Sequence, residues 1–189
     1  MAAKAGTPKG KKPNNTNKFK PGDLVVYPAH GVGRIEAIES KNIGETSEDF
    51  YIMKIIETNM VIMIPVKNLK AVGIRDVITK KEIPEIYKII QHQNKSGAVS
   101  DNQTWNRRYK EYMDKIRTGS LYEIAEVFRD LFLLKKTKDL SFGERKLLDT
   151  AQGLLVTELS IAKGTKENSV MSEIESFFPK PQPQQHATE

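Results

Sequence analysis

The sequence predicts an α+β protein in which a small, five-stranded antiparallel β barrel is followed by an all-helical bundle domain. Two observations predict this order. Within residues 22–74, short β-branched runs alternate with turn residues, whereas from Pro84 onward apolar residues recur at helical spacing. A chain of 189 residues, of which 38% are apolar, is long enough for two small domains with modest cores.

The chain begins with a lysine-rich segment that has almost nothing to bury. The first 20 residues contain six lysines and no acidic residue, and these six equal the whole formal net charge of +6. We expect residues 1–19 to form a disordered basic tail, since such a composition cannot offset the entropy of ordering. The tail is equally consistent with loose attraction to phosphates and with a role in solubility.

Residues 20–80 form the first predicted domain. Five strands are expected there, over residues 24–27, 33–39, 50–56, 60–64 and 69–74. Pro28 and Gly31 mark the first turn, the acidic polar stretch 42–49 is read as a loop, and Thr58 begins a third turn. Short antiparallel strands with tight turns are typical of SH3-like or Tudor-like barrels.

Residues 81–178 form the predicted helical domain. Helices are expected over residues 84–92, 104–118 and 169–178, with two longer ones between the last two. Ser120 with Glu123, and Ser141 with Glu144, match the capping box that begins a helix. The polar stretch 93–103 is read as a loop, and residues 179–189 as a flexible C-terminal tail.

Several function classes lack their sequence signals. The chain has no cysteine, its three histidines are far apart, and it contains neither a GxxxxGK[ST] loop nor a serine elbow. We therefore expect no metal, no cofactor and no catalytic residue, so that the protein is not an enzyme. His30, in the turn of VVYPAHGVG, is read as a hydrogen-bonding turn residue. The longest apolar run, residues 60–66, is too short to span a membrane, and we expect a cytoplasmic protein.

The single tryptophan, Trp105, begins a helix that carries several basic residues. Trp105, Tyr109, Tyr112 and Ile116 fall on one apolar arc, and basic residues flank that arc on both sides. Two interpretations are open. Trp105 is either the first core residue of the stripe, or an aromatic plane at the helix end that stacks on an unpaired base beside phosphate-binding cations.

Four segments, in order over residues 19–161, resemble the CarD (CdnL) family of bacterial transcription regulators. They are KPGDLVVYPAHGVGRIEAIE (20–39), VGIRDV (72–77), TWNRRYKEYMDKIRTGS (104–120) and LSFGERKLLDTAQGLLVTEL (140–159). The resemblance implies a Tudor-like domain that docks on the β subunit of RNA polymerase. It also implies a helical domain that reaches promoter DNA at the upstream edge of the transcription bubble.

The resemblance also assigns roles to individual residues. Trp105 is expected to wedge into the minor groove, without reading sequence, and so to stabilise the open promoter complex. The residues expected to contact DNA phosphates are Arg107, Arg108, Lys110, Arg145 and Lys146. Of two basic positions that face the polymerase in the family, Lys41 matches one, and Met63 stands at the other. A monomer that is nucleoid-associated through the polymerase is expected.

A second hypothesis comes from another class. The chain would then be an SH3-like RNA- or ribosome-associated binding module, with the lysine-rich tail as its main nucleic-acid contact. Loss of all nucleic-acid effects on deletion of residues 1–18, with no effect of Trp105→Ala, would favour this alternative.

Overall fold

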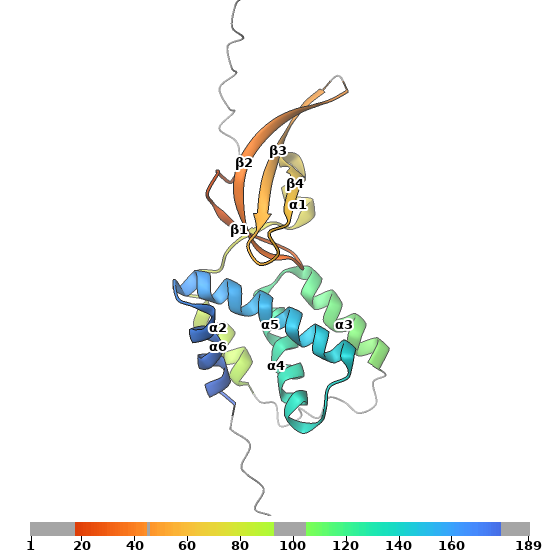
Figure 1. The fold of residues 1–189 in the computed structure, drawn as a ribbon, viewed down its shortest axis with the longest axis vertical. Coiled ribbons are helices and arrows are strands. Elements are labelled where there is room, and N and C mark those ends of the chain that lie inside the picture. Colours follow the sequence, from red (N-terminus) through yellow and green to blue (C-terminus); the bar gives the residue numbers. More distant parts are fainter. Residues whose placement is uncertain (1–17, 45, 93–104, 179–189) are drawn as a thin grey trace, which may run out of the picture.

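The computed structural model of the chain describes residues 18–44, 46–92 and 105–178. A β domain stands on a helical domain, with the long helix α5 (Phe142–Lys163) running beneath the sheet (Figure 1). The predicted fold class, an antiparallel five-stranded sheet followed by helices, is confirmed. The two predicted tails, apart from Lys18 and Phe19, and the predicted loop 93–103 lie outside the described residues.

The β domain is one antiparallel sheet with the strand order β4-β3-β2-β1-β5. Its strands are β1 (Leu24–Tyr27), β2 (Gly31–Ile43), β3 (Thr46–Ile55), β4 (Val61–Pro65) and β5 (Arg75–Asp76). Phe19, expected at the end of the tail, belongs to this domain, because its side chain is only 2% exposed and packs on Tyr51. The Tyr51 hydroxyl also accepts a hydrogen bond from the Phe19 N–H at 3.1 Å.

The fifth strand is not the one that the sequence predicted. Residues 69–74 were expected to be extended, but they follow the short 3-10 helix η1 (Val66–Asn68) and contain the single-turn helix α1 (Leu69–Val72). Gly73, at φ 79°, ends this turn in the left-handed conformation, and the chain then enters β5. The prediction failed because a short apolar run fits a buried helical turn as well as a strand.

The polar stretch 42–49, expected to be a loop, is mostly strand. The register of β2 and β3 continues to the pair Ile43 and Thr46, so that the two strands form a long hairpin that projects from the sheet (Figure 1). Polar cross-strand contacts support it, including a 2.5 Å hydrogen bond from the Ser40 hydroxyl to Asp49. Such contacts replace the apolar alternation by which a strand is recognised.

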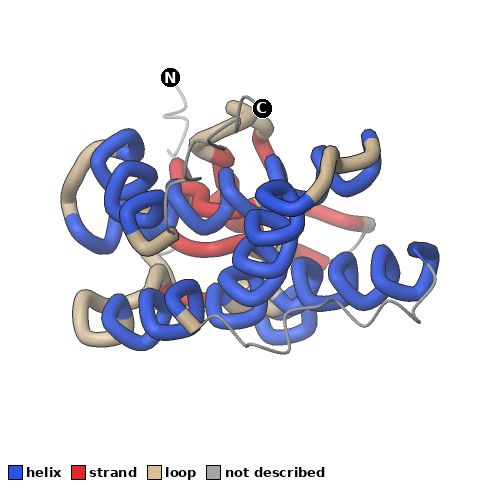
Figure 2. Tube along the Cα trace, turned by 90° about the horizontal axis from the view of Figure 1, so that it is seen from below, coloured by secondary structure: helices blue, strands red, loops and turns tan. Residues whose placement is uncertain are grey.

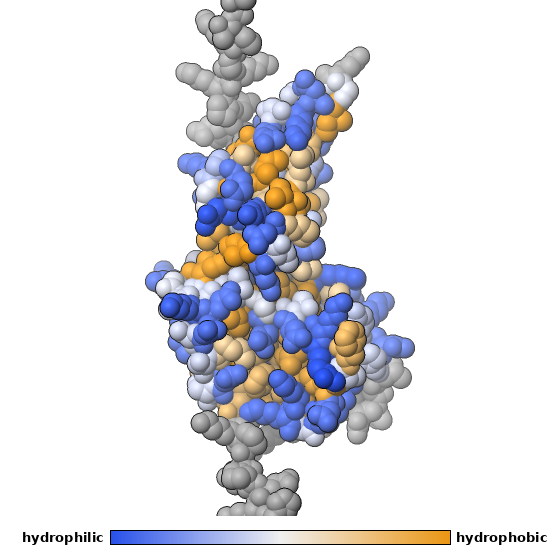
Figure 3. All heavy atoms as spheres, in the orientation of Figure 1, coloured by the Kyte–Doolittle hydropathy of each residue, from blue (hydrophilic) through white to orange (hydrophobic). Residues whose placement is uncertain are grey.

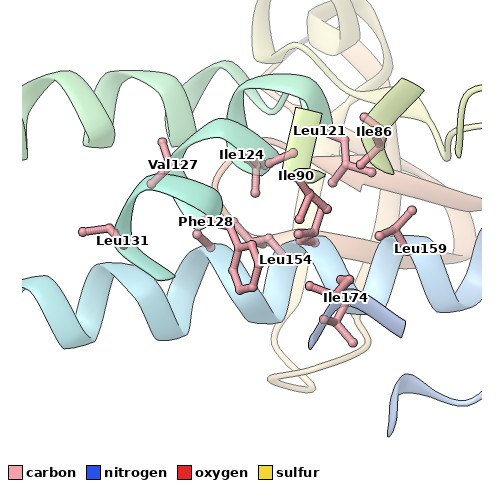
Figure 4. Close-up of a cluster of buried hydrophobic side chains, with 14 of the residues drawn as sticks. Ile86, Ile90, Leu121, Ile124, Val127, Phe128, Leu131, Leu154, Leu159 and Ile174 are labelled. Carbon is pink, nitrogen blue, oxygen red and sulfur yellow. The ribbon is translucent and has the colours of Figure 1, made fainter. Parts of the chain in front are cut away.

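The helical domain is built around α4 (Leu121–Thr137) and α5. Helices α2 (Ile83–Gln91), α3 (Trp105–Thr118) and α6 (Glu167–Ser176) pack around this pair, as the view from below shows (Figure 2). Aliphatic and aromatic side chains from α2, α4, α5 and α6 meet in a single buried cluster that includes Ile90, Phe128, Leu154 and Ile174 (Figure 4). The helices therefore share one core.

One of the two predicted capping boxes is confirmed. At the start of α5, the Ser141 side chain accepts from the Glu144 N–H, and the Glu144 side chain accepts from the Ser141 N–H. At the start of α4, the Ser120 side chain makes no capping bond. The Thr118 hydroxyl instead donates to the Glu123 carboxylate and accepts from the Ser120 N–H. Thr118 therefore bonds to the carboxylate that was predicted to bond to Ser120.

A buried ion pair connects the two domains. Arg75, in β5, donates to both carboxylate oxygens of Glu158, in α5, at 2.5 and 2.8 Å. The same guanidinium donates to the carbonyl of Gly119, between α3 and α4, at 2.6 and 2.9 Å. Glu158 is only 2% exposed, and it also accepts from the Ile78 N–H at 3.1 Å. These contacts fix the sheet relative to α3, α4 and α5.

The VVYPAHGVG turn lies at this same junction. A Cβ atom at Gly31, where φ is 85°, would come within 3.0 Å of Leu154 on α5. A Cβ atom at Gly119 would likewise come within 3.1 Å of Pro28. The N–H of His30 donates to the Tyr27 carbonyl at 3.0 Å, which agrees with the predicted turn role. Gly31 of this motif and Gly119 of the helical domain therefore permit close packing between the domains.

Candidate nucleic-acid interface

Helix α3 presents its aromatic residues at two levels of burial. Tyr112 and Ile116 are buried against the helical core, and burial raises the pKa of the Tyr112 hydroxyl to about 12. Toward the N-terminus of the helix, Tyr109 is 42% exposed and Trp105 is partly exposed. The apolar arc predicted from the sequence is therefore buried in the C-terminal half of α3 and partly exposed in its N-terminal half.

The indole of Trp105 rests on the beginning of α5. A Cβ atom at Gly143 would come within 2.9 Å of the Trp105 Cζ2 atom, so only glycine leaves room for the ring in this position. The Tyr109 ring covers another side, with the two ring centroids 5.6 Å apart. Trp105 is thus partly buried against the helical core, as the first interpretation expects, without being enclosed by its neighbours.

An exposed phenylalanine that the sequence analysis did not single out lies next to this glycine. Phe142, the first residue of α5, is 81% exposed, which is unusual for so large an apolar side chain. A signal was present in the sequence. The Ser141 capping box places Phe142 at the helix start, off the apolar stripe of Leu147, Leu148 and Ala151, so nothing in the helix pattern would bury it.

Four of the five predicted phosphate-contacting residues are exposed, two on α3 and two on α5. Arg107 and Lys110 lie one turn apart on α3, and Arg145 and Lys146 lie in the first turns of α5. Residues three and four apart share one face of a helix, so Arg145 and Lys146 lie on the same side as Phe142. Both pairs therefore lie within the first two turns of α3 and α5, the helices whose starts meet where Trp105 rests on Gly143.

The fifth predicted phosphate contact, Arg108, points in a different direction. Its side chain is only 17% exposed, and its Nη2 atom lies 3.7 Å from the buried Glu144 carboxylate. Arg108 therefore faces α5, whereas Arg107 and Lys110 on the same helix face solvent.

A shallow groove of about 480 Å³ follows the polar side of α3, but its charge is mixed. Its lining alternates cations and carboxylates, namely Arg107, Lys110, Glu111, Asp114, Lys115, Thr118 and Glu123. Lys115 is engaged with Glu126 at 2.8 Å. As a whole such a lining does not favour a polyanion. Along α3, its cations Arg107 and Lys110 lie nearer to Trp105 than the carboxylates of Glu111 and Asp114 do.

The two predicted polymerase-contacting positions lie in the β domain, apart from each other. Lys41 is exposed on the β2–β3 hairpin opposite Glu48, while Met63, 46% exposed, lies on the edge strand β4 opposite Ile52. The structure does not bring them together. Figure 3 shows apolar residues over the strands. The large apolar residues of the β domain that are exposed are Ile43, Ile56, Met60, Val61 and Met63.

Within residues 18–44, 46–92 and 105–178, no group of three or more acidic, histidine or cysteine side chains is placed to hold a metal ion. Among the helices described, none combines the length and the apolar character that crossing a membrane requires.

Comparisons with known proteins cover both domains. Residues 19–78 match the family model of the CarD-like/TRCF RID domain, and residues 85–175 match that of the CarD C-terminal domain. Over 154 residues the chain is 40% identical to a Bacillus subtilis (strain 168) protein named "Putative transcription factor YdeB", which covers 82% of this chain and 98% of that protein.

Two solved structures of Myxococcus xanthus proteins are similar to the first domain. The solution NMR structure of the 72-residue N-terminal domain of CarD is 32% identical, covers 39% of this chain and 93% of its own, and has a TM-score of 0.28. The structure of CdnLNt is 36% identical, covers 40% of this chain and 97% of its own, and has a TM-score of 0.29.

Proposed function

The chain belongs to the CarD family of transcription regulators, and we propose that it binds RNA polymerase and stabilises the open promoter complex. The β domain docks on the β subunit, and the helical domain inserts Trp105 into the minor groove at the upstream edge of the transcription bubble. The CarD-like/TRCF RID family interacts with RNA polymerase, which supports the first part. The role needs no chemical step.

The observation that carries the second part is the combination of aromatic rings and cations at one end of the helical domain. Trp105 is partly exposed over Gly143, and Phe142 is 81% exposed beside it. Apolar side chains that enter the minor groove separate stacked base pairs, and nearby cations bind the phosphates that flank them. Arg107, Lys110, Arg145 and Lys146 are the exposed cations for that task.

Differential affinity is sufficient for the regulatory effect. A protein that binds the open complex better than the closed one shifts the equilibrium by that difference, and about 1.4 kcal/mol changes it tenfold. Stacking of one aromatic side chain on a base contributes roughly 1–3 kcal/mol. Docking on the polymerase raises the local concentration of the helical domain, so its own affinity for DNA can be low.

The lifetime of the open complex tests the role of Trp105. With purified polymerase, Trp105→Ala should shorten this lifetime by about tenfold, if the ring contributes at least 1.4 kcal/mol, and should leave polymerase binding unchanged. Tyr122→Ala is a matched control, since Tyr122 is also a partly exposed aromatic residue but follows the opposite end of α3. An equal lifetime for Trp105→Ala and the wild type would refute the wedge.

The edge strand β4 is the proposed docking element of the β domain. It pairs only with β3 in the described sheet, so one edge of the strand is open. Hydrogen-bonded pairs alternate along an antiparallel ladder, and Ile55 donates to the Met60 carbonyl. By this alternation, the backbone groups of Val61 and Met63 face the open edge. A strand of the polymerase can extend the sheet there, whatever side chain residue 63 carries.

Proline substitution separates this main-chain docking from side-chain contact. Met63→Pro removes the outward N–H, a change that an edge strand tolerates, and should abolish capture of the protein by immobilised polymerase. Met63→Leu keeps the N–H and an apolar side chain, and should bind like the wild type. If Met63→Pro folds and binds normally, docking does not use this edge.

A further inference from the structure

The buried carboxylate of Glu144 lies directly behind the proposed wedge. Glu144 is the third residue of α5, is only 2% exposed, and follows Gly143, on which the Trp105 ring rests. Helix α3 reaches the same point with Arg108, one turn after Trp105. The two helices therefore meet through a glycine that contacts the ring and through the charged pair that follows it.

Glu144 is held from three sides. One carboxylate oxygen accepts from the Ser141 N–H at 2.8 Å, and the other accepts from Lys138 at 3.1 Å and lies 3.7 Å from Arg108 Nη2. Burial by itself would raise the pKa of this carboxyl, but the hydrogen bonds from Ser141 and Lys138 outweigh burial and lower it. Glu144 is therefore ionised at neutral pH, and one of its carboxylate oxygens faces two cations, Lys138 and Arg108.

Arg108 is committed to this contact. Its Nε atom is buried and has no hydrogen-bond partner among the described residues, and only 17% of its side chain is exposed. Turning outward to a phosphate would remove one of the two cations that face this buried carboxylate and leave it to Lys138 and the Ser141 N–H, which is unfavourable because a buried charge needs its partners. Arg107 and Lys110 carry no such cost, because they already face solvent.

We infer that Arg108 and Glu144 are a positioning pair that fixes the start of α3 on the first turn of α5 and thereby sets the exposure of the Trp105 ring. Arg108 then acts on DNA only through Trp105 and is not itself a phosphate contact. The consequence for the open complex rests on the function proposed above. The effect on the free protein does not depend on it.

Trp105 is the only tryptophan, so the fluorescence of the free protein reports on the pair directly. Arg108→Gln and Glu144→Gln should each shift the emission to longer wavelength and increase quenching by acrylamide. The double variant should show no more than the larger single effect, since residues that act as a pair are not additive. Unchanged emission and quenching in Arg108→Gln would overturn the inference, and this variant decides alone if Glu144→Gln does not fold.

The salt dependence of DNA binding in the polymerase complex separates positioning from phosphate contact. Each phosphate contact that is lost reduces the log-log slope by about 0.9 on duplex DNA. Arg107→Gln and Lys110→Gln should show this reduction, whereas Arg108→Gln should shorten the open-complex lifetime at an unchanged slope. A slope reduced in Arg108→Gln as in Arg107→Gln would overturn the inference.

The two measurements distinguish the failure of either proposal. If Trp105→Ala leaves the lifetime unchanged while Arg108→Gln still alters the fluorescence, the positioning pair stands and the wedge function fails. If the lifetime depends on Trp105 but neither the emission nor the quenching responds to Arg108→Gln, the function stands and the pair fails.

Discussion

At the scale of single residues, the site depends on two aromatic side chains with different surroundings. Trp105 is supported by Gly143 and Tyr109, whereas Phe142 has 81% of its side chain in contact with solvent. An exposed apolar ring stabilises the fold little, so it can be given up to a contact outside the domain at small cost. Under the proposed function, that contact is with unstacked bases or sugars next to Trp105.

Phe142→Ser tests this difference between stability and function. Because the ring is almost fully exposed, the free energy of unfolding should change by no more than about 0.5 kcal/mol. The lifetime of the open complex should nevertheless fall. Chemical denaturation and the lifetime assay measure the two quantities. A large loss of stability, or an unaltered lifetime, would contradict the account of this residue.

Sequence reasoning reached some of these residues and missed others for physical reasons. The spacing of Trp105, Tyr109 and Tyr112 placed them correctly on one arc of α3. Arg108 lies at the edge of that arc, where small rotations of a helix decide between solvent and core, so its orientation required coordinates. Phe142 was missed because an apolar side chain at a helix start conforms to no period.

At the scale of elements, a hydrogen bond distinguishes two serine caps that look alike in the sequence. Ser141→Ala should lower the free energy of unfolding by about 1 kcal/mol, because it removes the bond to the Glu144 N–H at the start of α5. Ser120→Ala is the matched control and should cost less, because that side chain makes no capping bond. Urea denaturation measures both, and equal losses would contradict the assignment.

The periodicity of apolar residues identified the long helices but not the short helical turns after Pro65. Helices α2 to α6 were predicted within a few residues because their apolar stripes are long and their ends carry proline, glycine or capping residues. The run after Pro65 was too short for its period to be read, and it forms helical turns instead of a strand. The outer part of the β2–β3 hairpin, residues 42–49, was read as a loop because its cross-strand pairs are polar.

At the scale of the whole molecule, the Arg75–Glu158 pair fixes the orientation of the helical domain relative to the β domain. Arg75→Gln leaves the buried Glu158 charge without its partner, which costs about 3–5 kcal/mol. Arg117→Gln is the control, since its pair with Asp114 is exposed and should contribute less than about 1 kcal/mol.

Thermal unfolding and small-angle X-ray scattering measure the consequences. Arg75→Gln should unfold at lower temperature and show a broader distribution of domain orientations, with a shorter open-complex lifetime despite normal polymerase capture. A variant as stable and as compact as the wild type would show that the pair does not connect the domains. This contact joins residues 83 positions apart, so no local pattern in the sequence indicated it.

The central claim is that an anchored indole prefers separated strands to paired ones. The most direct test compares affinities, in the presence of polymerase, for promoter DNA with an opened upstream fork and for the same DNA fully paired. The account predicts that the wild-type protein binds the forked DNA about tenfold more tightly, equivalent to about 1.4 kcal/mol, and that Trp105→Ala removes this preference. Equal affinities for the two DNAs, or a preference that persists without the indole, would contradict it.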